Sequence, residues 1–134
     1  MSISRRQFLR TTAAAGGSVL ALRQRVHAAG SDLLRVGLVG CGSRGAGAAS
    51  NAINADPGVR VVALADVFAD RVQATLKSLR GRHPDQVDVD PARCFVGFDA
   101  YKELIACGVD VVLLAAPPHF RPLHLAAAIA ANKH

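Results

Sequence analysis

The feature that most constrains the fold is a glycine-rich turn between a short apolar run and a helical pattern of small residues. The apolar run, residues 34–39, leads into Gly40, Gly42 and Gly45, which have the spacing Gly-x-Gly-x-x-Gly. Where such a turn joins a strand to a helix, it binds the pyrophosphate of a dinucleotide. The first glycine allows the sharp turn, the second lets the backbone approach the phosphates, and the third lets the helix pack closely on the sheet. Free N–H groups at the start of the helix face the phosphates.

An acidic residue follows at the position that such a turn requires. A second apolar run, residues 59–65, ends at Asp66, about twenty residues beyond the turn. A carboxylate there can accept hydrogen bonds from both hydroxyls of the adenosine ribose, and its charge repels a 2′-phosphate. The sequence therefore predicts NAD as the cofactor, with NADP less favoured. The alternative is that Asp66 caps the next helix, because the end of a strand suits both roles.

Strand and helix patterns alternate after this first turn. The polar stretch 83–91 predicts a surface loop, and the segments 34–39, 59–65, 94–97 and 109–115 predict strands. The last of these is apolar on both faces, as a central parallel strand should be. This alternation predicts an α/β fold, a Rossmann-type doubly wound parallel sheet with the strand order 3-2-1-4.

Four helices are expected between and after these strands. The first spans residues 44–55, and the last spans 123–133. The second has one apolar stripe and Gly81 as its end, and the third has Asp99 as its cap and Gly108 as its end. The side chains expected to face inward on the second and third helices are Phe68, Val72, Leu76, Leu79, Tyr101, Leu104 and Ile105.

The predicted topology brings three segments to one edge of the sheet. In doubly wound folds, ligands bind outside the carboxyl ends of the strands, where the strand order reverses. Here that point lies between the first and fourth strands. Residues 40–45, Asp66 and residues 116–119 are therefore expected along one rim.

The first 28 residues have the features of an export signal. Arg5 and Arg6 form a twin-arginine motif, a weakly apolar stretch spans residues 11–22, and residues 26–28 form a small-residue cleavage site. We expect the twin-arginine export machinery as a partner, a periplasmic location, a linker at 29–33 and a nucleotide-binding domain at 34–134. An amphipathic N-terminal helix is the alternative.

The charge distribution and the spacing of the cysteines argue against two kinds of binding site. Five arginines and no acid lie in the first 28 residues, so the net charge of +6 for the whole chain falls to +1 beyond them. This charge distribution does not indicate nucleic-acid binding. Cys41, Cys94 and Cys107 lack metal-ligand spacing, so we expect no metal site and interpret them as packing residues. An oxidising compartment would permit a disulfide between Cys94 and Cys107, but spacing alone does not support one.

The chain resembles the N-terminal half of a Gfo/Idh/MocA oxidoreductase, the family of glucose–fructose oxidoreductase and inositol dehydrogenase. The resemblance covers about residues 33–134. It rests on Val-Gly-Leu-Val-Gly-Cys-Gly-Ser-Arg-Gly at 36–45, on Ala-Asp-Val at 65–67 and on Ala-Pro-Pro-His-Phe-Arg-Pro-Leu-His at 116–124. It implies that the third segment flanks the cofactor. The residues expected to bind the cofactor are Gly40, Gly42, Ser43, Arg44, Gly45, Asp66, Ala116, Pro117, Pro118, His119 and His124.

Several of these side chains have a second interpretation. His124 supports the cofactor loop or is a packing histidine, and His119 reaches the nicotinamide side or lies in a surface loop. Arg44 lies over the phosphates or is an exposed arginine at the start of a helix. Arg71 approaches the adenine end or, as we favour, lies on a solvated helix face.

The resemblance also implies an activity. Family members transfer hydride between a nicotinamide cofactor and the hydroxyl-bearing carbon of a sugar or cyclitol-like substrate, and they usually form homo-oligomers. The family's Glu-Lys-Pro motif, its later strands and its substrate domain have no counterpart in this sequence. We therefore assign no catalytic residue and expect a truncated reading frame. The alternative function is that of an inactive NAD-binding remnant.

Overall fold

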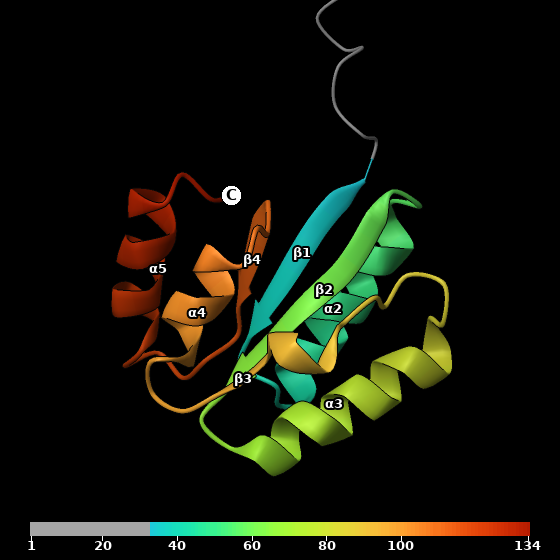
Figure 1. Cartoon of the computed structure of the whole chain (residues 1–134), viewed down its shortest axis with the longest axis horizontal. Coiled ribbons are helices and arrows are strands. Elements are labelled where there is room, and N and C mark those ends of the chain that lie inside the picture. Colours follow the sequence, from blue (N-terminus) through green and yellow to red (C-terminus); the bar gives the residue numbers. More distant parts are fainter. Residues whose placement is uncertain (1–32) are drawn as a thin grey trace, which may run out of the picture. The chain divides into compact units, whose positions relative to one another are not determined.

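The computed structural model describes residues 33–134 (Figure 1). The twin-arginine motif, the cleavage site after Ala28 and most of the expected linker lie outside the described residues. Among residues 33–134, no helix combines the length and the apolarity needed to cross a membrane.

The described chain alternates between strands and helices, as the sequence patterns predict. A parallel sheet has the order β3-β2-β1-β4, which confirms the α/β fold class and the predicted strand order. The elements are β1 (Leu34–Val39), α2 (Ser43–Ala55), β2 (Val59–Asp66), α3 (Ala69–Arg82), the short 3₁₀ helix η1 (Pro91–Arg93), β3 (Cys94–Val96), α4 (Ala100–Ala106), β4 (Val111–Leu114) and α5 (Arg121–Ala130).

Helices cover both faces of the sheet. Figure 1 shows α2 and α3 on one side of the strands and α4 and α5 on the other. Leu38 and Leu64 project to the α2–α3 side, where they pack with Leu79, while Val39 and Ala65 project to the α4–α5 side. Burial of each large aliphatic side chain stabilises the fold by about 1.5–3 kcal/mol. The two cores hold the carboxyl ends of β1, β2 and β4 at one rim.

Three expectations around the second helix are wrong. Gly81 does not end α3, which continues through Arg82, because its backbone keeps helical geometry and the next N–H, that of His83, still bonds to a helix carbonyl. Phe68 does not face the core; it precedes the helix and is 55% exposed. Nor is the stretch 83–91 only a surface loop. Val87 and Val89 are buried, and Val87 pairs with a residue of β2 in an isolated bridge.

The other deviations concern the bounds and caps of elements. Strand β4 is shorter than predicted, and α5 begins at Arg121 and ends at Ala130 rather than spanning 123–133. The carboxylate of Asp99 makes no capping hydrogen bond, because its backbone (φ −95°, ψ 0°) is already helical, whereas a capping residue is usually extended. Asp99 instead forms an ion pair of 2.7 Å with Lys102. Tyr101, Leu104 and Ile105 are buried, as predicted.

Candidate functional site

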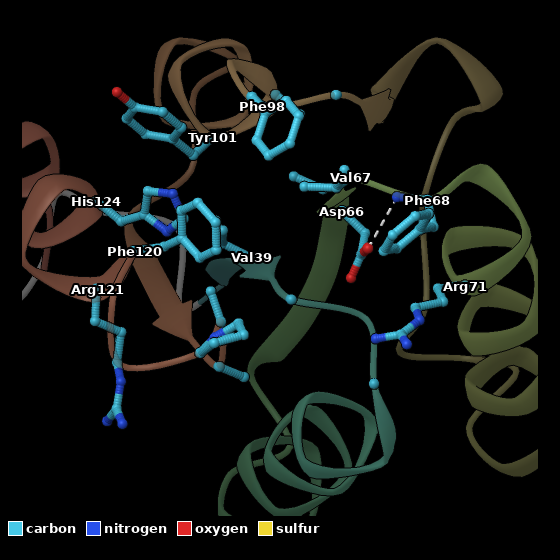
Figure 2. A pocket seen from close by; sticks show the side chains of 18 of the residues that line it. Val39, Asp66, Val67, Phe68, Arg71, Phe98, Tyr101, Phe120, Arg121 and His124 are labelled. Atoms are coloured by element: carbon cyan, nitrogen blue, oxygen red, sulfur yellow. Dashed lines mark hydrogen bonds between the residues drawn. The ribbon is translucent and has the colours of Figure 1, made fainter.

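A cavity of about 530 Å³ lies at the carboxyl ends of the strands. Segments that follow β1, β2, β3 and β4 line it, together with the first turns of α2, α4 and α5. Figure 2 shows Asp66, Phe68 and Arg71 on one side of this cavity and Phe120, Arg121 and His124 on the other. The cavity therefore lies at the switch point of strand order, where doubly wound folds bind ligands.

The glycine turn forms the floor of the cavity and needs glycine for steric reasons. Gly40 has φ +99°, and a Cβ there would lie 2.6 Å from the Ala116 nitrogen. At Gly45, a Cβ would collide with the carbonyl oxygen of Gly40. A Cβ at Gly42 would meet nothing within 4 Å, so the space above this residue is open to a ligand. The first and third glycines are thus required by the protein's own packing, and the second leaves room for a bound group.

The N-terminus of α2 is available to an anion. Its N-cap residue, Gly42, provides no side-chain cap, and the first turn contains no acidic residue. The first four N–H groups of a helix have no partner within the helix, and together with the helix dipole they attract negative charge. The start of α2 therefore fits a phosphate or pyrophosphate group.

The carboxylate of Asp66 is held at the end of β2 by two backbone N–H groups. Its Oδ2 accepts a hydrogen bond of 2.7 Å from the N–H of Cys41, and its Oδ1 accepts one of 3.0 Å from the N–H of Phe68. The dashed line in Figure 2 marks the second bond. The N-cap of α3 is Phe68, so Asp66 is not the N-cap that the alternative interpretation required. A half-buried carboxylate that lines the cavity can still accept hydrogen bonds from a ligand through its remaining lone pairs.

Cys41 links the glycine turn to the sheet, and its thiol is unreactive. Its thiol is buried and approaches the carbonyl oxygen of Ala65 at 3.6 Å. Burial, with the nearby charge of Asp66 as a smaller cause, raises the pKa of the Cys41 thiol to about 12. Since the thiolate is the reactive form, this cysteine is a packing residue.

We expect iodoacetamide at about pH 7.5 to modify Cys94 and Cys107 well before Cys41 in the folded chain. Burial also raises the pKa of both these thiols, but both are partly exposed, whereas Cys41 is shielded from the reagent. Peptide mass spectrometry of samples quenched over time measures the three rates, and the denatured chain is the control, in which the three should react alike. Equal rates in the folded chain would contradict the buried position of Cys41.

Aromatic rings form the wall of the cavity opposite Asp66. Phe120 lies between Phe98, at 6.2 Å between ring centroids, and His124, also at 6.2 Å. His124 in turn packs on Tyr101 at 4.4 Å. Phe98, Tyr101 and Phe120 are not among the residues predicted for the site. The signal was present for Phe98, because it follows β3, and all parallel strands end at the same edge of the sheet.

His124 is a buried polar group within this aromatic wall. It is 6% exposed, and its Nδ1 has no hydrogen-bond partner. Desolvation by burial lowers the pKa of His124 below its usual 6.5. The imidazole is therefore neutral at neutral pH. Its position combines both sequence interpretations, since it packs in the wall and also lines the cavity.

The pKa of His124 predicts that the domain loses stability in weak acid. Because the folded-state pKa lies below 6.5, the unfolded chain takes up the proton first, and the free energy of unfolding falls as the pH drops below 6.5. Urea unfolding from about pH 7.5 to about pH 5.5 should show this fall in the wild type and a smaller fall in His124→Phe. The exposed His119 supplies the control, because His119→Asn should keep the wild-type slope. A His124→Phe profile parallel to that of the wild type would contradict the prediction.

The structure brings most of the predicted cofactor-binding residues into the cavity. Three of them do not line it. Ser43 lines a separate shallow hollow beside α2, and Gly45 is buried against the turn. His119 is exposed, and its ring is nearly perpendicular to that of Phe120, at 5.4 Å between centroids. Arg71 is exposed, as the favoured interpretation predicts, and it also lines the cavity, with its guanidinium 5.2 Å from the Phe68 ring. The predicted residues that line the cavity are Gly40, Gly42, Arg44, Asp66, Ala116, Pro117, Pro118 and His124.

The class that the fold defines is a Rossmann-type α/β domain, with a cavity at the switch point of its parallel sheet. No known family profile matches the chain, and no curated protein matches it. Several solved structures do match the chain. A scyllo-inositol dehydrogenase from Lactobacillus casei, with bound NAD(H) and scyllo-inositol, matches 76% of this chain with a TM-score of 0.59 and 20% identity. A myo-inositol 2-dehydrogenase from Lactobacillus plantarum matches 76% with a TM-score of 0.56 and 20% identity.

A third similar structure is a 3-ketoreductase from Actinomadura kijaniata in complex with NADP and TDP-benzene. It matches 76% of the chain with a TM-score of 0.53 and 26% identity. The matched region covers 26% of each inositol dehydrogenase chain and 27% of the ketoreductase chain, so the chain spans about a quarter of the length of these enzymes. This chain thus shares its fold with part of these dehydrogenases and of the ketoreductase.

Proposed function

We propose that the domain binds NAD as the nucleotide-holding part of an oxidoreductase. The observation that carries this proposal is the hydrogen bond from the Cys41 N–H, inside the glycine turn, to the Asp66 carboxylate. This bond holds the two groups that a dinucleotide needs, a phosphate-binding turn and a ribose-binding acid, side by side at one cavity.

The residues around the cavity fit the parts of the cofactor in order. The adenosine ribose binds at Asp66, and the pyrophosphate lies over Gly42 and the N-terminus of α2. The nicotinamide half extends toward Ala116 and the aromatic wall near His124. When bound, the cofactor supplies the hydride chemistry, and the protein binds and orients it.

NAD is the favoured cofactor because of charge. A fixed carboxylate repels the 2′-phosphate of NADP and accepts hydrogen bonds from the free 2′-hydroxyl of NAD. Arg71, which lines the same side of the cavity, moderates this repulsion but does not cancel it, because its guanidinium is exposed and screened by solvent.

The proposed reaction of the whole protein is hydride transfer at a hydroxyl-bearing carbon of a sugar or cyclitol. Support comes from the substrates named for the similar structures and from the resemblance to Gfo/Idh/MocA oxidoreductases. None of the described residues is assigned an acid–base role. The twin-arginine motif supports export to the periplasm. This route fits a cofactor-binding protein, because it carries proteins that are already folded and have bound their cofactor.

Calorimetric titration of the full chain with NAD tests the proposal. We expect saturable binding to a folded sample, with tighter binding of NAD than of NADP and binding of ADP-ribose through the same site. Circular dichroism establishes that the sample is folded. No saturable heat at millimolar NAD from a folded sample would refute the proposed function.

A further inference from the structure

Thr75 makes a buried hydrogen bond to the glycine turn although it does not line the cavity. It lies in the middle of α3, is 5% exposed, and donates from Oγ1 to the carbonyl oxygen of Cys41 at 2.8 Å. This bond joins residues far apart in the sequence across the α2–α3 side of the domain. A hydroxyl in an apolar core costs free energy unless it is hydrogen-bonded, so its one acceptor here matters.

The bond completes a set of contacts that fix Cys41. The N–H of Cys41 donates to Asp66 at 2.7 Å, its thiol approaches the carbonyl of Ala65, and its own carbonyl accepts from Thr75. Cys41 lies between Gly40 and Gly42, and glycine gives the backbone on both sides unusual freedom. Together with the 2.8 Å bond from the Gly40 N–H to the Ala65 carbonyl, these contacts fix where the Cys41 N–H points. That N–H, with the N–H of Phe68, in turn holds the Asp66 carboxylate.

We propose that Thr75 is a positioning residue for the dinucleotide site, acting through Cys41 on the Asp66 carboxylate. The inference rests on the proposed function. Thr75 fixes the Cys41–Gly42 peptide through its carbonyl oxygen and thereby restrains Cys41, whose N–H, in the preceding peptide, holds the carboxylate toward the ribose. The restrained Cys41–Gly42 peptide also sets the path of the phosphate-binding turn. Recognition of ribose and of pyrophosphate is thereby coupled through one buried hydroxyl.

Replacement of the hydroxyl tests this role. Thr75→Val keeps the shape of the side chain but removes the donor, and it should weaken NAD binding about three- to tenfold, as expected for one lost hydrogen bond. It should also reduce the preference for NAD over NADP, because the carboxylate is less fixed. Thr75→Ser keeps Oγ and should restore both values to within about twofold of the wild type.

Two comparisons separate positioning from a structural effect. In an Asp66→Ala background, Thr75→Val should change the NAD dissociation constant less than it does in the wild type, because the carboxylate on which it acts is gone. Ser50→Ala removes another buried hydroxyl, bonded to His83 at 2.6 Å and not at the cavity. This control should leave the NAD to NADP ratio unchanged whatever it does to stability.

Amide hydrogen exchange of Cys41, measured by NMR in the absence of nucleotide, tests the inference independently. Its N–H should exchange faster in Thr75→Val and at the wild-type rate in Thr75→Ser. Unchanged exchange in Thr75→Val overturns the inference, and so does an unchanged NAD to NADP ratio in that variant. Absence of NAD binding by the wild type refutes the proposed function instead, and the exchange rates then still decide whether Thr75 positions the turn.

Discussion

Gly45→Ala is expected to lower the free energy of unfolding by about 3 kcal/mol or more. The added Cβ would collide with the backbone carbonyl of Gly40, and no side chain can move aside to relieve this contact. Helix α2 would have to shift away from the sheet, which would also open the glycine turn. Urea unfolding followed by circular dichroism measures the loss, and NAD titration of the remaining folded protein should show weakened binding.

Gly47→Ala is the matched control, because Gly47 lies in the same helix. A Cβ there would meet nothing within 4 Å, so this substitution should stabilise the domain by about 0.5–1 kcal/mol through the better helix propensity of alanine. If both substitutions changed the free energy of unfolding equally, this result would contradict the close packing of α2 on the turn.

Asp66→Asn is expected to weaken NAD binding about 10- to 100-fold, because hydrogen bonds to a charged carboxylate are stronger than those to a neutral amide. Binding of NADP should change less, since the substitution also removes the repulsion of the 2′-phosphate. The preference for NAD should therefore shrink. Calorimetric titration with both cofactors gives the two dissociation constants.

Asp70→Asn removes an acid only four residues away and serves as the control. Asp70 lies in the first turn of α3, is exposed and does not line the cavity. We expect its dissociation constants to match those of the wild type. If Asp66→Asn kept the wild-type preference for NAD over NADP, the Asp66 carboxylate would not be the group that binds the ribose.

The sequence predicts the order of elements well because periodicity and glycine spacing are local signals. The bounds of β1 agree with the apolar run 34–39, and the strand order follows from the alternation of strands and helices. The errors occur where a local signal is too weak to decide the outcome or where tertiary packing overrides it. Gly81 reads as a helix end, but nothing in the surrounding structure requires the helix to stop there, and α3 continues. Val87 lies in a polar stretch, yet an isolated bridge to Val61 buries it.

The candidate site, too, is predicted only where its residues belong to a local motif. Gly40 and Asp66 have motif spacing and could be found from the sequence. Phe98 carries no motif, and Phe120 lies in the segment 116–124 without being predicted as a site residue; both line the cavity because β3 and β4 end at its edge. Thr75 could not be found at all, since its role depends on a contact between residues 34 positions apart.

The two backbone hydrogen bonds of Asp66 limit how cofactor choice can change in this chain. The carboxylate that repels a 2′-phosphate is also an anchor for the glycine turn and for the residue before α3. A replacement that admits NADP but has no side-chain acceptor would thus loosen the phosphate-binding backbone at the same time. Evolution or engineering of a new cofactor preference therefore has to keep an acceptor for the Cys41 N–H, either at residue 66 or through a second substitution.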